Sequence, residues 1–149
     1  MNERNTIRIF DYFSVKELFT HCANYEIVDC IKYHYIDSVL LLGVVLDSFR
    51  DFLGYPIVVT SSYRDIEHNK RVGGVSTSQH LVGQAIDFTC YKIPPKQMIK
   101  EFKNFCQSSP LANYLGQVIF YNSFIHIGLR TESHNKLTFY DKRTNKQTN

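Results

Sequence analysis

Three residues in this chain have the types and the spacing of a metal site. His80 precedes Asp87 by seven residues, and Gly83 between them lets the chain turn, so a loop imidazole can fold back over a strand carboxylate. His126 comes much later, within a predicted strand. Two imidazoles and one carboxylate can hold a tetrahedral Zn²⁺ and leave its fourth position for water, as in catalytic rather than structural zinc sites.

Alternation along two predicted strands separates these polar residues from the apolar ones. In 85–89, Ile86 and Phe88 share one face and Asp87 lies on the other. The same period of two separates His126 from its isoleucine neighbours. A carboxylate in the middle of a sheet requires a positive partner when it is buried.

Two other interpretations of these residues stay open. In the first, Asp87 caps a loop or pairs with Arg64, and His80 and His126 are only polar residues at the end of a sheet. In the second, the residues form the two-histidine, one-carboxylate triad of non-haem Fe(II) oxygenases. The long interval between His80 and Asp87 argues against the oxygenase.

The first half of the chain predicts helices. Ser14 and Glu17 have the form of a capping box, which predicts a short helix from there to about Asn24. Apolar spacing predicts a long, largely buried helix over 36–53, with Gly54 as its C-terminal stop. A further helix begins at Pro94–Pro95 and continues through Phe105.

Strands dominate the rest of the pattern. The unbroken β-branched segment 56–60 predicts a central strand, and a long loop over 61–83 follows it, with a helical turn at 65–72. Further strands are predicted at 85–89, in a hairpin that pairs 117–121 with 124–128 across Asn122–Ser123, and at the sheet edge over 136–140. With helices grouped early and strands late, we expect an α+β fold with a mainly antiparallel central sheet and helices packed on one side.

Length and composition favour a single globular domain. The chain has 149 residues, of which 44% are hydrophobic, and we expect one domain over 1–149 with a core at about 13–140 and a polar tail at 141–149. The net charge of +3 is scattered, which excludes the basic stripe of a nucleic-acid-binding protein. The apolar stretches are too short for membrane insertion, and the N-terminus lacks a secretory signal, so synthesis in the cytoplasm is expected. The four cysteines form no C-x-x-C pair and are interpreted as reduced thiols.

A series of short motifs follows the predicted strand at 56–60. The motifs are Ser61-Ser-Tyr-Arg64, Asn69, Val72-Gly-Gly-Val75, Ser78-Gln-His-Leu-Val-Gly-Gln-Ala-Ile-Asp87 and Phe124-Ile-His-Ile127. In this order they resemble the zinc D-Ala-D-Ala carboxypeptidase family, particularly its short and often phage-encoded members. The resemblance covers about 13–129, and its most specific part is the Ser-x-His element followed by Asp87 and a distant histidine.

The resemblance implies a fold, a cofactor and a reaction. It implies a hedgehog-like or D-Ala-D-Ala-peptidase-like domain whose Zn²⁺ is held by His80, Asp87 and His126. Arg64 matches the arginine that binds the terminal carboxylate of the substrate, and Ser78 would bond either the peptide or a ligand. The expected function is a zinc peptidase, monomeric, that acts on peptidoglycan stem peptides in the cell wall after export or lysis.

One position departs from the family pattern. Members commonly carry Asp or Glu three residues before the last ligand as the general base, and that position here is Ser123. A hydroxyl cannot hold a proton in transit as a carboxylate does, and such assistance is typically worth roughly 10²–10⁴-fold. Tyr121 can donate to an oxyanion, and Glu132 can fold back, but neither occupies the family's position. The alternative function is therefore a metal-containing module that binds peptidoglycan without cleaving it.

Overall fold

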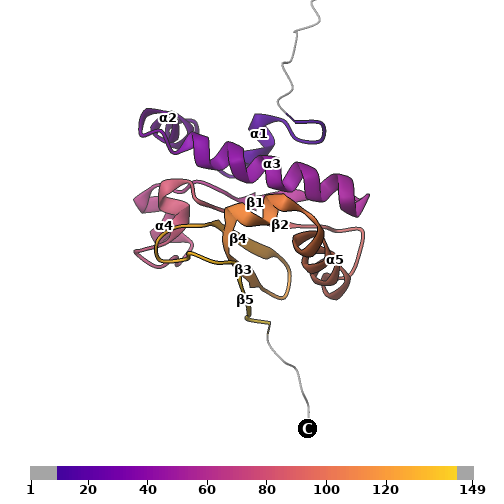
Figure 1. Cartoon of the computed structure of the whole chain (residues 1–149). Coiled ribbons are helices and arrows are strands. Elements are labelled where there is room, and N and C mark those ends of the chain that lie inside the picture. Colours follow the sequence, from indigo (N-terminus) through magenta and orange to yellow (C-terminus); the bar gives the residue numbers. More distant parts are fainter. Residues whose placement is uncertain (1–9, 144–149) are drawn as a thin grey trace, which may run out of the picture.

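The computed structural model describes residues 10–143 and places one five-stranded sheet at their centre (Figure 1). The strand order is β1-β2-β4-β3-β5, and every neighbouring pair is antiparallel except β3 and β5. The predicted α+β class with a mainly antiparallel sheet is confirmed. The strands are β1 (Val58–Ser61), β2 (Ala85–Thr89), β3 (Leu115–Phe120), β4 (Ile125–Leu129) and β5 (Thr138–Asp141).

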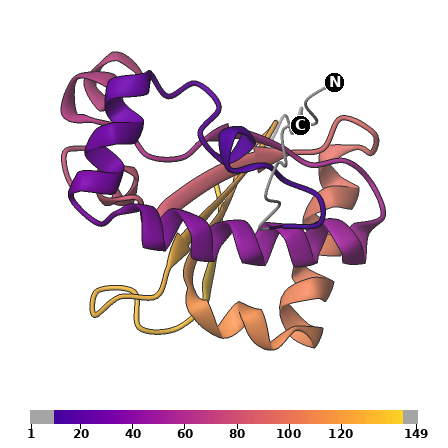
Figure 2. The same ribbon diagram turned by 90° about the horizontal axis from the view of Figure 1, so that it is seen from above.

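Helices cover one side of this sheet. The long helix α3 runs along it, with α5 beside one end of α3 and the pair α2 and α4 toward the other (Figure 2). Gly54 caps α3 in the left-handed conformation, as predicted. The helical elements are α1 (Val15–Leu18), α2 (Asn24–Lys32), α3 (Ile36–Leu53), α4 (Ile66–Arg71), η1 (Gln79–Val82), α5 (Pro95–Ser108) and η2 (Pro110–Tyr114), where η marks a 3₁₀ helix.

The apolar face of β2 forms the centre of the core. Ile86 and Phe88 are fully buried, and the Phe88 ring lies 5.9 Å from Phe49 of α3 and 5.5 Å from Phe102 of α5. Burying a large apolar side chain contributes roughly 1.5–3 kcal/mol, so this face fixes β2 firmly against the helices. Asp87 therefore lies on the opposite face of a well-anchored strand.

The N-terminal helix prediction was wrong in its extent. The capping box of Ser14 and Glu17 is present, but α1 ends at Leu18, and His21 follows with a positive φ of 69°. The separate helix α2 was not predicted, because its large apolar residues Val28 and Ile31 are exposed and give no buried stripe.

The prediction of a central strand at 56–60 was also wrong. The strand begins at Val58 and lies at the edge of the sheet, with β2 as its neighbour. Val58 is 38% exposed, whereas Val59 is buried beneath the helices. A β-branched segment indicates a strand that packs on at least one face, and it does not specify the strand's position in the sheet.

Other expectations have simpler outcomes. The hairpin of β3 and β4 and the edge strand β5 are confirmed, although β5 runs parallel to β3. The four cysteines are free thiols. Between residues 10 and 143, no helix has the length and apolar character needed to cross a membrane. Of the predicted polar tail, Asp141 ends β5, and 144–149 lie outside the described residues.

A buried carboxylate joins α2 to the segment that carries α4. Glu26 is 1% exposed and accepts hydrogen bonds from the backbone of Ala23 and Asp65, each at 3.1 Å, and from His68 Nδ1 at 2.8 Å. Burial raises the pKa of Glu26, but these donors outweigh it and hold the pKa below its usual value. Glu26 thereby fixes the chain directly after Arg64.

We expect Glu26→Gln to destabilise the fold by about 1.5–3 kcal/mol, because a buried ionic acceptor with three donors is lost. Since the folded pKa lies below the ordinary 4.5, the stabilisation from Glu26 is complete above that value and disappears as pH falls through the folded pKa. Urea unfolding at several pH values measures both effects. The control is Glu67→Gln, whose side chain is 74% exposed and should change stability little. Equal stabilities for the two variants at neutral pH would contradict this role.

Candidate metal centre

The structure brings His80, Asp87 and His126 together. Asp87 Oδ1 lies 3.2 Å from His80 Nε2 and 2.8 Å from His126 Nδ1. The possible ligand atoms of the three residues all lie within 4.8 Å of one another. This is the spacing of donors that can share one ion.

Strand pairing and one glycine produce this arrangement. The register of β2 against β4 sets Asp87 directly opposite His126. His80 lies in η1, where Ser78 Oγ accepts a hydrogen bond from the His80 backbone N–H. Gly83 ends η1 at a φ of 69°, and a Cβ there would lie 2.7 Å from the Tyr35 carbonyl oxygen. The chain can return into β2 in this way only with glycine at that position.

The donor set suits a cation. His80 Nδ1 contacts the carbonyl oxygen of Ser62, which can only accept, so this nitrogen carries a proton. In a neutral imidazole, Nε2 then presents a lone pair to the carboxylate oxygen of Asp87. Two acceptors that face each other require a proton or a metal ion between them. The residues therefore fit Zn²⁺, with His80 oriented by its second nitrogen as metal-binding histidines commonly are.

Asp87 remains ionised in this setting. It is 5% exposed, and its Oδ2 lies 3.4 Å from Arg64 Nη2, so the pairing with Arg64 considered as an alternative occurs together with the histidine cluster. Burial raises the pKa of Asp87, but the contacts with His126 and His80 outweigh it and hold the pKa below its usual range.

Arg64 is a partly buried cation beside the cluster. Its Nε donates to Ser61 Oγ at 2.9 Å, and its Nη1 lies 3.4 Å from Asn69 Oδ1. Burial lowers the pKa of Arg64, and Asp87 opposes that shift, so the guanidinium keeps its charge. Its backbone N–H also donates to the carbonyl oxygen of His80, which ties the arginine segment to η1.

A cavity of about 460 Å³, here called the metal cavity, opens over the cluster. Arg64, Ser78 and Tyr121 line it together with the three possible ligands, so the structure brings together every predicted site residue. The Tyr121 ring stacks on Phe124 at 4.5 Å. Burial and the charge of Asp87 raise the pKa of Tyr121, so its phenol stays protonated and able to donate.

Ser123 lies in an adjoining cavity of about 550 Å³, here called the Ser123 cavity, which shares Arg64, Asp87 and Phe124 with the metal cavity. The Ser123 carbonyl oxygen accepts a hydrogen bond from Thr89 Oγ1 at 2.7 Å, which fixes the tip of the β3–β4 hairpin near Asp87. Glu132 is exposed and lines neither cavity.

The sequence did not indicate two features of the metal cavity. His134 and Lys142 line it, although each comes from a segment beyond the family motifs. Their positions depend on the turn after β4 and on the parallel pairing of β5, and no spacing pattern in the sequence predicts either one.

Comparison with known proteins assigns this geometry to a family. A search of curated proteins found no match. A family model described as peptidase M15 matches residues 11–128, which include the three clustered residues and Arg64. This is the family of zinc D-Ala-D-Ala carboxypeptidases, whose members are zinc-dependent peptidases that act on peptidoglycan. The match covers most of the chain, so the chain belongs to the peptidase M15 family.

Proposed function

We propose that this chain is a zinc-dependent peptidase that cleaves peptidoglycan stem peptides, at the D-Ala-D-Ala bond or at a neighbouring stem or cross-link bond. The observation that carries the proposal is the convergence of His80, Asp87 and His126 in one cavity with the Arg64 guanidinium. The action on the cell wall, after export or lysis, is part of this proposal. Family membership favours the peptidase over the Fe(II) oxygenase.

Three side-chain atoms would hold the metal: His80 Nε2, a carboxylate oxygen of Asp87 and His126 Nδ1. When bound at such a site, zinc polarises a carbonyl group and lowers the pKa of a water molecule. The chain's own residues bind and orient the peptide around that chemistry.

Arg64 and Ser78 are the candidates for substrate binding. The guanidinium is held on one side by Ser61 and Asn69, and it presents a fixed charge to the cavity for a peptide carboxylate. Ser78 Oγ already accepts the His80 N–H, so its own proton is free for an acceptor on the substrate. Tyr121 can donate its phenolic proton to the carbonyl oxygen where negative charge develops.

Position 123 favours a second candidate function. Ser123 shares a cavity with Asp87 and Arg64, but its hydroxyl does not act as a proton acceptor at neutral pH. A protein with this site and no general base would bind stem peptides and turn them over slowly. Binding without turnover is therefore the alternative.

Hydrolysis of purified muropeptides tests the proposed function directly. We expect zinc-loaded protein to shorten stem peptides, with the cleaved bond visible as a mass change by mass spectrometry. The control is the same protein with His126→Ala, which should release no product. Binding of intact muropeptides with no product after long incubation would support the alternative function instead.

Metal content tests the ligand set. We expect His126→Ala to lose most bound zinc, because a site with two ligands loses much of the chelate effect. A chelator should lower the Tm of wild type, because the metal binds only the folded state. The matched control is His134→Ala, since His134 lines the same cavity but lies outside the cluster. Equal zinc content in wild type and His126→Ala, measured by elemental analysis, would rule out this site.

Restoring a carboxylate tests the departure at position 123. We expect Ser123→Asp to raise turnover by as much as ~10²-fold, because a base would then lie in the cavity that Asp87 also lines. Arg64→Ala should lower kcat/KM whether Ser or Asp occupies position 123, since carboxylate recognition is lost in both. If wild type is already fast and Ser123→Asp has no effect, another residue is the base.

A further inference from the structure

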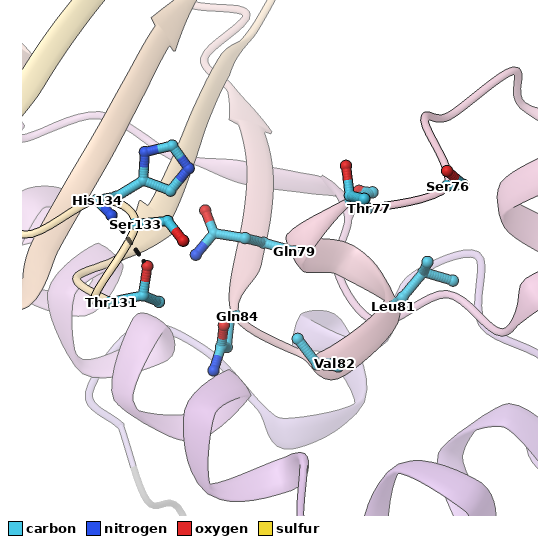
Figure 3. Close-up of a pocket in the computed structure, with 10 residues that line it drawn as sticks. Ser76, Thr77, Gln79, Leu81, Val82, Gln84, Thr131, Ser133 and His134 are labelled. Atoms are coloured by element: carbon cyan, nitrogen blue, oxygen red, sulfur yellow. Dashed lines mark hydrogen bonds between the residues drawn. The ribbon is translucent and has the colours of Figure 1, made fainter.

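A third cavity, of about 360 Å³, adjoins the metal cavity (Figure 3). It shares four lining residues with the metal cavity, and it shares none with the Ser123 cavity. The metal cavity is therefore the middle section of a three-part groove, with the Ser123 cavity, which Arg64 and Asp87 also line, at one end and this third cavity at the other. The shared residues are Thr77, Ser78, Gln79 and His134.

Most residues that line this cavity are polar, with Leu81 and Val82 as the apolar ones, and none of the described lining residues is Asp, Glu, Lys or Arg, so we call it the neutral cavity. Hydroxyl and carboxamide groups supply both donors and acceptors, while a charged ligand would find no counter-charge there. The groups come from Ser76, Thr77, Ser78, Gln79, Gln84, Thr131 and Ser133.

One wall of the neutral cavity depends on Gly128 of β4. Gln79 Nε2 donates to the carbonyl oxygen of Leu129 at 3.1 Å, and its carboxamide lies so close to Gly128 that a Cβ there would overlap with Oε1. In the described part of the chain, the buried Oε1 has no hydrogen-bond partner. This places a fixed carboxamide beside the groove, with its buried Oε1 against Gly128.

The opposite wall depends on Gly116 of β3. The turn from Thr131 to His134 closes on itself, with Thr131 N donating to His134 O at 3.1 Å and His134 N donating to Thr131 Oγ1 at 3.2 Å. A Cβ at Gly116 would overlap with the His134 carbonyl, so glycine lets the turn lie against the sheet. Figure 3 shows the turn facing Gln79 across the cavity.

These two glycines lie at one place on the sheet. Gln117, next to Gly116, pairs with Gly128, and the β3 register is irregular at Gly116. Neighbouring strands thus both lack a side chain where the two polar walls rest. The neutral cavity lies between η1 with its flanking loop and the 131–134 turn, and the two glycines let both segments approach the sheet closely.

We propose that the neutral cavity is a binding subsite for the part of the substrate on the N-terminal side of the cleaved bond. This rests on the proposed function, in which Arg64 takes a carboxylate on the C-terminal side. An uncharged chain rich in donors and acceptors fits the lining, and both the peptide backbone of a stem and the hydroxyls of its attached sugars have that chemistry. The volume lies within the roughly 300–1,000 Å³ of small-molecule sites.

Binding to chelator-treated full-length protein tests the subsite without turnover. Three probes are compared by calorimetry: acetylated D-Ala-D-Ala, the free stem pentapeptide and the disaccharide pentapeptide. We expect a longer probe to bind about 3- to 10-fold more tightly than the dipeptide, as one or two additional neutral hydrogen bonds would give. A gain at the pentapeptide identifies the peptide as the occupant, and a gain only with the disaccharide identifies the sugar.

The matched variants are Gln84→Leu with Ser133→Ala, both in the neutral cavity and outside the metal cavity, and Gln107→Leu, exposed on α5. The double variant should lose the higher affinity for the longer probe, and Gln107→Leu should keep it. Thermal unfolding checks that both variants fold. Three results would overturn the subsite: equal affinities for all probes in wild type, an undiminished gain in affinity in the double variant, or no binding of any probe. Hydrolysis by zinc-loaded protein is scored separately. If affinity rises with probe length but no probe is hydrolysed, only the proposed peptidase activity is refuted. If probes are hydrolysed but affinity does not rise with probe length, only the subsite is refuted.

Discussion

The buried Asp87 carboxylate is the constraint on which the rest of this structure depends. A charge at 5% exposure is tolerated only with partners, and Asp87 has two imidazoles on one oxygen and a guanidinium on the other. Each partner comes from a different segment, so satisfying this one group fixes η1, β4 and the segment after β1 relative to β2. The site and the fold are specified by the same interaction.

The strand that carries Asp87 separates structure from chemistry by its two faces. Ile86 and Phe88 bind the strand to α3 and α5, while Asp87 and its opposite neighbour His126 point away from that core. Burial of the aromatic face offsets the cost of a carboxylate and a guanidinium that are partly removed from water. Glycines complete the arrangement: Gly83 returns the chain into β2, and Gly116 and Gly128 leave space for polar groups beside the cluster.

Features that repeat along the chain could be predicted from the sequence, and features that depend on distant pairing could not. The period of two in β2 and β4 placed Asp87 and His126 on one face, and the spacing around Gly83 added His80. Helix α2 was missed because its large apolar residues Val28 and Ile31 are exposed, and β1 was placed centrally because composition does not distinguish an edge. The groove that extends past His134 depends on a turn closed against Gly116, which is a tertiary contact without a local signal.

We infer that Asp87 and its two histidines form one metal site rather than a hydrogen-bonded cluster. A crystal structure of the zinc-loaded protein, with anomalous data collected on both sides of the zinc edge, tests this most directly. We expect one zinc ion, seen as an anomalous peak, within bonding distance of His80 Nε2, Asp87 and His126 Nδ1, with His80 Nδ1 still on the Ser62 carbonyl. Zinc bound elsewhere, or no peak while Asp87 keeps its direct hydrogen bonds to both imidazoles, would contradict it.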